Sequence, residues 1–554
     1  MSDPLGTGVD EPPDRDGAFP RLGDEQRAKL RAMGRVRAVQ SGEVLFRAGD
    51  VTCDFFVVES GAVAIVQGYE HENRVIAVHG AHRFLGELNL LTGSRIYLTA
   101  VVRDAGEVIQ VPVDRLRRVV AEDAELSNLI LGAFLARRAI LIEAGTGAKV
   151  VGSRYSRDTI RIREFFARNR MPYQWIDVEA DEEADTLLCA LHVAPDEIPV
   201  VVGGGEVLRN PSNNDVARLL GLGARGAPPA MCDLVIVGGG PAGLAAAVYG
   251  ASEGLDTQAI DAIAFGGQAS TSSRIENYLG FPAGISGSEL AERAALQAGK
   301  FGARLAIPAE AVRLVREDGH FSVGLASGDV VNGRSVIVAT GAQYNKLDVP
   351  ELERFEGLGV YYAATQSEAL LCSGDTVVFV GGGNSAGQAA MFLSQHAAQC
   401  HLLIRGADIG KSMSRYLVDE IERTEEVEVM TCSEVVELIG DQVLDRVVVR
   451  DTRTGERREL PCKALFVFIG ASPHTDWLGG LVAMDEHCFL LTGRDLVDGT
   501  LDAYQGESPL FLETSQPGVF AVGDVHSGSI KRVASAVGEG SMAVALVHQR
   551  LAMR

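Results

Sequence analysis

The chain has 554 residues, of which 46% are hydrophobic and 23% charged, and its formal net charge is −23 at pH 7. At roughly 100 to 200 residues per domain, this length predicts three or four globular domains. The acidic balance argues against nucleic acid as a partner, because such binding rests on Lys and Arg neutralising phosphates. The apolar runs are shorter than the roughly 18 residues of a membrane span, so no membrane partner is expected.

Residues 1–19 are acidic and rich in proline, with no apolar core, and we interpret them as a disordered tail rather than a signal peptide. The eight cysteines lie far apart and form no Cys-x-x-Cys pair, a pattern typical of the reducing cytoplasm. The same spacing argues against a zinc ribbon, so no metal site is predicted. We therefore expect a cytoplasmic protein.

The segment 20–146 has short β-type runs separated by glycine turns, followed by a helical pattern from 114 to 142. This pattern predicts a β-roll closed by a helix. Residues 42–50 (GEVLFRAGD) and 84–91 (FLGELNLL) resemble the motifs of cyclic-nucleotide-binding domains. The resemblance predicts a domain of that kind.

By this resemblance, Gly86 and Glu87 would hold the phosphate and a ribose hydroxyl of a bound nucleotide. Leu98 stands where that family has the arginine that neutralises the cyclic phosphate, and Arg95 is the nearest substitute. Loss of a charge-assisted contact costs roughly 1.5–3 kcal/mol. We expect a cyclic nucleotide or another small ligand as a partner, with weak or no binding of cyclic AMP.

The segment 147–222 alternates strands and helices: strands at 149–151, 174–178 and 200–202, and helices at 158–169, 182–191 and 213–220. It resembles a thioredoxin or glutaredoxin fold, with Ile198-Pro199 suited to that family's cis-proline. Ser153 and Ser156 stand where its Cys-x-x-Cys would lie, and serine cannot cycle through a disulfide. We interpret this module as a docking or structural element. A linker rich in glycine and proline follows at 223–230.

Two glycine clusters each lie between a buried strand and a helix, the arrangement that binds dinucleotide pyrophosphates. The first, residues 238–243 (GGGPAG), fits G-x-G-x-x-G, and Asp261 follows at the end of the next strand, where a carboxylate can bind a ribose. The second, residues 381–386 (GGGNSA), fits the G-x-G-x-x-A variant. The candidate cofactor-binding residues of these clusters are Gly238, Gly240, Ala242, Gly243 and Asp261 in the first, and Gly381, Gly383, Asn384, Ser385 and Ala386 in the second.

The second cluster lacks a ribose-binding acid after its next strand, which leads instead into Arg405, with Lys411 and Arg415 further on. Positive charge at this place favours a 2′-phosphate, so NADPH is expected and NADH is the alternative.

From residue 232 onward the chain resembles the thioredoxin-reductase family of flavoproteins. The motifs that carry the resemblance are residues 266–268 (GGQ), 276–282 (ENYLGFP), 339–342 (ATGA), 518–525 (GVFAVGDV) and 538–540 (GEG). It implies an FAD domain in two parts, 231–345 and 465–554, an NAD(P)H domain inserted at 346–464, and a homodimer. It also places five residues near FAD: Gly267, Gln268, Asn277, Gly523 and Asp524. The expected fold is therefore multidomain α/β: a β-roll plus helix, a thioredoxin-like unit, and a Rossmann-like core that binds two dinucleotides.

The redox dithiol of thioredoxin reductases follows a Gly-Val-aromatic segment like residues 359–362 (GVYY). Here Ala363 and Gln366 occupy the two cysteine positions, so neither a thiolate nor a reducible disulfide exists there. Cys372 lies a few residues beyond. It is the only candidate for a catalytic thiol, although free cysteine commonly packs as a small buried hydrophobe.

Three hypotheses follow. The first is an NAD(P)H-dependent FAD oxidoreductase that passes electrons to an unknown acceptor, such as a small redox protein, under regulation by the N-terminal domain. The second is a thioredoxin-disulfide reductase with dispersed cysteines. The third is a redox or nucleotide sensor whose turnover is incidental.

Overall fold

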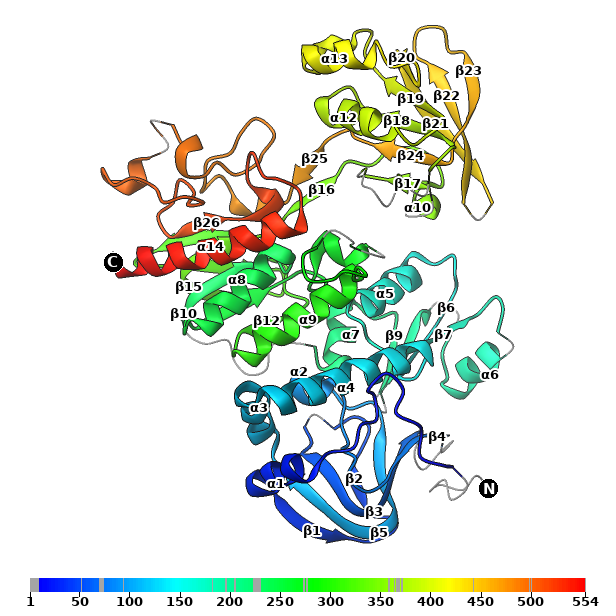
Figure 1. The fold of residues 1–554 in the computed structure, drawn as a ribbon, viewed down its shortest axis with the longest axis vertical. Helices are drawn as coiled ribbons and strands as arrows, with labels where there is room; N and C mark the ends of the chain where they lie inside the picture. The colour runs from blue at the N-terminus through cyan, green and yellow to red at the C-terminus, as the bar shows by residue number, and fades with distance from the viewer. Residues whose placement is uncertain are drawn as a thin grey trace. The chain divides into compact units, whose positions relative to one another are not determined.

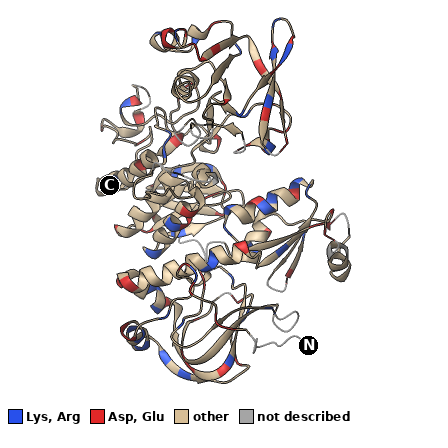
Figure 2. Ribbon diagram, turned by 45° about the vertical axis from the view of Figure 1, so that its right-hand side comes forward, with Lys and Arg blue, Asp and Glu red and all other residues tan. Residues whose placement is uncertain are grey.

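The computed structural model describes residues 9–50, 52–68, 74–92, 94–181, 183–194, 197–203, 206–222, 231–272, 275, 278–356, 359–362, 364, 369, 372–441, 443–497, 499 and 501–553. It has two compact units (Figure 1). Unit 1 combines residues 1–341 with 475–554, and unit 2 comprises residues 342–474. Figure 2 shows acidic and basic residues interspersed along the elements of each unit.

Unit 1 begins with a β-roll whose strands pair in the order β1-β5-β3-β4, with β2 on β5. Its elements are α1 (Asp24–Met33), β1 (Arg35–Val39), β2 (Val44–Phe46), β3 (Phe55–Gln67), β4 (Arg74–His79), α2 (Asn89–Thr92), β5 (Thr99–Val111), α3 (Val113–Glu122) and α4 (Ala124–Glu143). The single helix predicted at 114–142 is divided at Asp123, because the Asp123 carboxylate accepts hydrogen bonds from the N–H groups of Glu125 and Leu126 and starts a new helix.

The tail that precedes the β-roll departs from the prediction. Residues 9–19 belong to the segment interpreted as disordered, yet Ala18 is fully buried and Phe19 lines a cavity of the β-roll. The carbonyl oxygen of Ala18 also accepts a hydrogen bond from Arg137 on α4. Ala18 and Phe19 pack against the folded β-roll, so the average composition of the segment does not predict the order of these two residues.

The α/β module forms a four-stranded sheet in the order β7-β6-β8-β9. Its elements are β6 (Ala148–Gly152), α5 (Arg157–Arg168), β7 (Tyr173–Asp177), α6 (Glu183–Ala190), β8 (Val200–Gly203), β9 (Glu206–Arg209) and α7 (Asn213–Leu220). Strand β6 is parallel to β7 and antiparallel to β8. The peptide bond between Ile198 and Pro199 is cis. Strand β9 is an addition to the predicted elements.

The rest of unit 1 is built on a seven-stranded sheet in the order β12-β11-β10-β15-β14-β13, with β26 on β15. Its strands are β10 (Cys232–Val237), β11 (Thr257–Ile260), β12 (Arg304–Ala306), β13 (Ala311–Glu317), β14 (His320–Leu325), β15 (Val330–Val338) and β26 (Val519–Ala521). Its main helices are α8 (Pro241–Ser252), α9 (Gly287–Lys300) and α14 (Val533–Ala552). Helix α14 packs closely on α8, since a Cβ at Gly540 would lie 2.1 Å from the carbonyl oxygen of Ala242.

Unit 2 has a parallel sheet in the order β17-β24-β18-β19-β20 and a second sheet in the order β21-β22-β23. Its strands are β16 (Ala342–Tyr344), β17 (Val360–Tyr361), β18 (Thr376–Val380), β19 (Gln399–Ile404), β20 (Val427–Thr431), β21 (Ser433–Gly440), β22 (Leu444–Asp451), β23 (Arg457–Pro461), β24 (Ala464–Val467) and β25 (Ala471–Pro473). Its helices are α10 (Leu352–Phe355), α12 (Asn384–Leu393) and α13 (Arg415–Ile421). Across the described parts of both units, every helix is too short or too polar to cross a bilayer.

Candidate functional site

Three loops of unit 1 leave the sheet at the same edge. Strands β10, β15 and β26 are parallel, with Val237 opposite Val338 and Val338 opposite Ala521. The first glycine cluster, residues 339–341 and residues 523–525 therefore begin side by side at the carboxyl ends of these strands. This edge is where open α/β sheets bind their ligands.

The glycines of the first cluster have two different roles. A Cβ at Gly238 would lie 2.3 Å from the Ala339 carbonyl oxygen, and one at Gly243 would lie 1.9 Å from the Gly238 carbonyl oxygen, so both are required by close backbone packing. Gly240 instead borders open space, because its Cβ would meet only the Gly267 Cα, at 3.9 Å. Gly240 and Gly267 thus face each other at the N-terminus of α8. A Cβ at Gly267 would lie 2.9 Å from the Gly240 Cα, so Gly267 must be small for close packing. The open space beside Gly240 forms a cradle that a side chain there would fill and that fits a pyrophosphate.

Asp261 shapes this cradle. Its carboxylate accepts hydrogen bonds from the backbone N–H groups of Gly239 (2.8 Å), Ile263 (2.9 Å) and Ala264 (3.1 Å). A carboxylate offers about four acceptor positions, so capacity remains for a ribose hydroxyl. Asp261 is therefore suited both to hold the loop and to bind the ligand.

Gly523 packs against the start of α8, since a Cβ at Gly523 would lie 3.1 Å from the Ala242 Cβ. The N–H of Gly523 donates to the Glu539 carboxylate on α14 (2.6 Å), which also contacts the His526 imidazole at 3.1 Å. Burial raises the pKa of Asp524. The Glu539–His526 pair was not predicted from the sequence, although the motif at 538–540 contains Glu539 and could have pointed to it.

Two further predicted residues lie near the same loop in the chain. Gln268 directly follows Gly267 in a short 3-10 helix at residues Gly267–Thr271. Asn277 lies outside the described residues. The residues that are described fit an FAD group, with the cradle for its pyrophosphate and Asp261 for its ribose.

The second glycine cluster follows β18 in unit 2. Gly381 packs closely, since its Cβ would lie 2.3 Å from the Phe468 carbonyl oxygen. The segment after β19 is tied across this loop: the Ser414 N–H donates to the Asn384 side chain (2.7 Å), and the Ser412 hydroxyl donates to the Gly382 carbonyl (2.9 Å). The loop and the segment that carries the predicted cations are therefore held together.

Five predicted residues of this second site can be placed. Gly383 is the N-cap residue of α12, and a Cβ there would meet no neighbour within 4 Å. Ser385 is exposed and Ala386 buried at the start of α12, while the Arg405 and Lys411 side chains reach solvent. Neither cation forms an ion pair with a described residue. They are therefore available to a 2′-phosphate.

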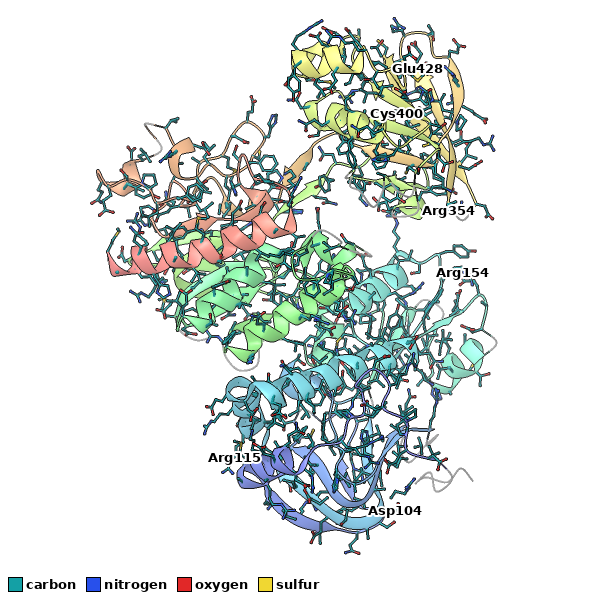
Figure 3. The ribbon with its side chains drawn as sticks, viewed as in Figure 1. Asp104, Arg115, Arg154, Arg354, Cys400 and Glu428 are labelled. Atoms are coloured by element: carbon teal, nitrogen blue, oxygen red, sulfur yellow. The ribbon has the colours of Figure 1, made fainter. Side chains whose placement is uncertain are left out.

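The cysteines buried in unit 2 are unsuited to thiolate chemistry, whereas Cys189 and Cys488 are exposed. All eight are free thiols, and Cys372, Cys400 and Cys462 are buried in unit 2. Burial raises the pKa of Cys400, labelled in Figure 3, to about 12. Burial also raises the pKa of Cys462. Residues 363 and 366 lie outside the described residues, but their identities exclude a dithiol there.

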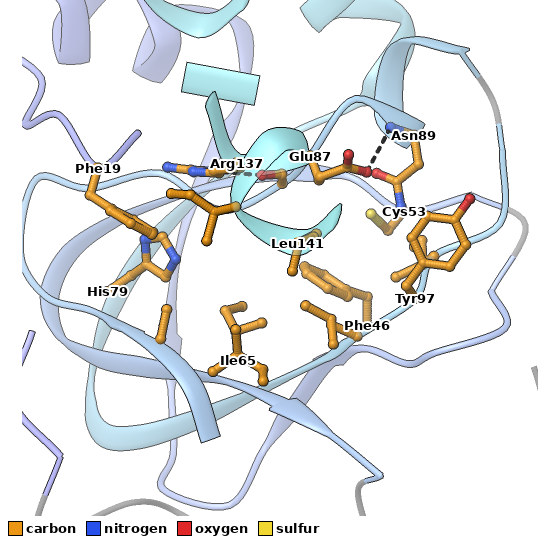
Figure 4. Close-up of a pocket in the computed structure, with 16 residues that line it drawn as sticks. Phe19, Phe46, Cys53, Ile65, His79, Glu87, Asn89, Tyr97, Arg137 and Leu141 are labelled. Atoms are coloured by element: carbon orange, nitrogen blue, oxygen red, sulfur yellow. Dashed lines mark hydrogen bonds between the residues drawn. The ribbon is translucent and has the colours of Figure 1, made fainter. Parts of the chain in front are cut away.

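The β-roll contains a cavity lined by Gly86, Glu87 and Leu98 (Figure 4). Two nitrogens of Arg138, on α4, hold both oxygens of the Glu87 carboxylate. Arg95, the predicted substitute for the phosphate-binding arginine, lies outside the cavity lining, and its guanidinium pairs with Glu206 on β9 at 3.2 Å. The side chains expected to bind a nucleotide are thus engaged with the protein itself.

A chain of polar contacts leads from this cavity to the first glycine cluster. Arg138 donates to the carbonyl oxygen of Arg170 in the α/β module (3.3 Å), and Arg170 forms an ion pair with Glu292 on α9 (2.6 Å). Next to Arg170, the Asn169 side chain donates to the carbonyl oxygen of Ile263 (3.1 Å), in the loop held by Asp261. All these groups belong to unit 1.

Comparison with known proteins finds two family matches along the chain. Residues 232–540 match the family described as pyridine nucleotide-disulphide oxidoreductase, and residues 36–123 match the cyclic nucleotide-binding domain. The chain is 32% identical over 311 residues to a thioredoxin reductase of Mycolicibacterium smegmatis, covering 56% of this chain and 94% of that protein. It is 30% identical over 318 residues to the 34.2 kDa protein in rubredoxin operon of Clostridium pasteurianum, covering 57% and 96%. A crystal structure of thioredoxin reductase from Streptococcus pyogenes is similar at 28% identity, with a TM-score of 0.51, covering 59% of this chain and 99% of that one.

Proposed function

Because the chain belongs to the pyridine nucleotide-disulphide oxidoreductase family, we propose that it passes electrons from NADPH to an acceptor that needs no dithiol on this chain. It is a thioredoxin-reductase-like NAD(P)H flavoprotein oxidoreductase, from a family that uses FAD and NADPH. The replacement of both family cysteines by Ala363 and Gln366 supports the finer proposal.

The protein's own residues supply binding and orientation. Bound FAD supplies the hydride chemistry, accepting hydride from the nicotinamide. The cradle at Gly240 and Gly267 would hold its pyrophosphate, and Asp261 its ribose. Arg405 and Lys411 would select NADPH through its 2′-phosphate. Without a dithiol relay, the acceptor must reach the flavin directly.

The α/β module supports docking rather than redox cycling. The Ser153 hydroxyl donates to Glu179 (2.5 Å), and Ser156 caps α5 by accepting from the Thr159 N–H. Both serines thus have structural partners at the positions where thioredoxins carry their thiols. We propose that this module helps to position a small redox protein.

The test is anaerobic reduction by NADPH or NADH followed by a panel of acceptors: rubredoxin, ferredoxin, flavodoxin, a quinone and thioredoxin. We expect yellow protein that NADPH bleaches faster than NADH, turnover with at least one acceptor, and very slow reduction of thioredoxin. Cys372→Ala should change nothing, like the matched buried control Cys400→Ala. Rapid thioredoxin turnover that is lost only in Cys372→Ala would instead reveal a relay with dispersed cysteines.

The contacts between Glu87, Arg138 and Arg170 support a second proposal, that the β-roll regulates flavin reduction. Asn169→Ala removes the last contact of the chain, with Ile263, without touching the glycine cradle. We expect it to change the rate of flavin reduction at unchanged FAD content. Exposed Gln174→Ala in the same module is the control. Equal rates in both variants would show that these contacts transmit nothing.

A further inference from the structure

The β-roll cavity contains charged and polar groups that the proposed reaction does not use (Figure 4). Its volume is about 80 Å³, against the roughly 10–15 Å³ that one water needs. Most of its wall is apolar: Phe19, Phe46, Ile65, Ile76, Ile96, Leu98, Ile140 and Leu141. Such a wall suits the body of a small organic molecule better than a cluster of water.

One end of the cavity holds a buried cation, Arg137, which is 6% exposed. Its guanidinium donates to the carbonyl oxygens of Ala18 (2.7 Å), Gly86 (2.7 Å) and Phe84 (3.1 Å). These bonds use three of its five N–H groups. Arg137 forms no ion pair with any carboxylate in the described parts of the chain. The carboxylates of Glu87 and Asp14 act on the charge of Arg137 only through space, and Glu87 is itself paired with Arg138. A buried cation without a direct counter-ion is costly, so an anion in the cavity would be favoured.

His79 lies beside this cation and is 3% exposed. Its Nδ1 has no hydrogen-bond partner among the described residues. Burial, followed by the charge of Arg137, lowers the pKa of His79 well below its usual range, so the imidazole is neutral. A neutral imidazole offers one donor and one acceptor and adds no second positive charge. Besides the Glu87 carboxylate, which Arg138 neutralises, and Asn89, the cavity therefore presents the Arg137 cation and the unpartnered His79 ring.

A cyclic nucleotide fits these groups poorly. Leu98 presents a hydrocarbon surface where the phosphate would need an arginine, and the charge of Glu87 is already neutralised by its ion pair with Arg138. We propose that the cavity binds a small organic monoanion with an apolar body, an aromatic or short aliphatic carboxylate, whose charge is held by Arg137 and His79. This carboxylate would be the ligand through which the β-roll regulates flavin reduction, as proposed above. Its binding to the cavity can be measured without turnover.

The test is calorimetric titration of the full-length protein with phenylacetate and hexanoate, with phenylacetamide as the neutral counterpart and cyclic AMP as the competitor. We expect at least one carboxylate to bind, and phenylacetate to bind roughly ten- to a hundred-fold more tightly than phenylacetamide, as for a charge-assisted contact. Arg137→Gln should remove that preference. Arg95→Ala, outside the cavity, should preserve it.

Because Arg137 also holds three backbone carbonyls, its variant could unfold the domain. Ile65→Trp fills the cavity from another wall and should abolish binding while FAD content and melting temperature stay unchanged. The proposal is overturned if neither carboxylate binds, if phenylacetamide binds as well as phenylacetate, if cyclic AMP binds more tightly than both carboxylates, or if Ile65→Trp binds like wild type. None of these four outcomes bears on the proposed oxidoreductase activity, because that activity is measured separately.

Discussion

The glycine cradle of unit 1 and the β-roll cavity both carry motifs of nucleotide-binding families, but in the β-roll the carboxylate is already paired with a cation and the phosphate-binding arginine is missing. At the cradle, Gly240 borders open space and Asp261 retains acceptor capacity. In the β-roll, Arg138 occupies Glu87, and Leu98 replaces the phosphate-binding cation. A binding motif that depends on backbone geometry can be recognised from its glycines alone. A motif that depends on charged side chains can lose its function when other parts of the fold pair with those charges.

The largest effect is expected at the cradle. Gly240→Val should abolish FAD retention, because the Cβ itself has room but the methyl groups would enter the space of the pyrophosphate. Purified wild type should carry about one FAD per chain and the variant almost none, measured by absorbance after denaturation. Gly299→Val is the control, since nothing lies within 4 Å of its Cβ on α9. A yellow Gly240→Val protein would show that the cradle binds something else.

The second prediction concerns restoring nucleotide binding to the β-roll. Leu98→Arg combined with Arg138→Gln restores the phosphate-binding cation and releases Glu87. Cyclic AMP affinity, measured by calorimetry, should rise roughly ten- to a hundred-fold over a weak or undetectable wild-type value. Arg95→Ala should have no effect, because Arg95 pairs with Glu206. Submicromolar binding of cyclic AMP by wild type would contradict the prediction, and loss of that binding in Arg95→Ala would show that Arg95 leaves Glu206 to hold the phosphate.

The sequence predicted the local backbone motifs but not the long-range side-chain contacts. The strand–glycine–helix clusters are local patterns, and α8 and α12 begin where those patterns place them. The partner of Glu87 lies 51 residues away on α4, and the Asn169–Ile263 contact spans 94 residues, so neither could be read from spacing. A signal for the first existed, because the adjacent arginines at 137 and 138 interrupt the otherwise apolar run 129–142 of α4, and a buried arginine requires polar partners.

The buried ion pair between Glu513 and Arg550 gives the same lesson. Arg550 on α14 donates two hydrogen bonds of 2.8 Å to Glu513, which is fully buried 37 residues earlier in the chain. Helical periodicity predicts an apolar face for α14 but gives no reason for an arginine within it. The fold brings the two charges together, and only then is the arginine explained.

The third prediction concerns the second glycine cluster. Arg405→Ala and Lys411→Ala should each raise the KM for NADPH roughly ten-fold, since each removes one charge-assisted contact with the 2′-phosphate. The KM for NADH should change little, because NADH lacks that phosphate. Arg415→Ala is the matched control, as Arg415 already pairs with Asp419 at 2.6 Å. Equal losses with both cofactors would remove the basis for the predicted NADPH preference.

The smallest effect is expected from His526, next to the cradle. Burial opposes its protonation, but the hydrogen bond and charge of Glu539 outweigh burial and raise the pKa of His526 above its usual 6.5. A raised folded-state pKa means that the pair's stabilisation is complete below pH 6.5 and is lost as the pH rises through the folded-state value. Its size is about 1 kcal/mol, as for one hydrogen bond, or about 2–4 °C in a domain of this size.

The measurement is the temperature at which flavin fluorescence appears on heating, which reports the FAD domain alone. Between about pH 6 and pH 9, wild type should lose stability relative to His526→Gln, whose amide can donate to Glu539 at every pH. His487→Gln is the control, because His487 is 74% exposed beside Glu486 and should add nothing. A difference between wild type and His526→Gln that does not change with pH would mean that His526 is held there by packing. The positive charge of His526 would then contribute nothing to the stability of the FAD domain.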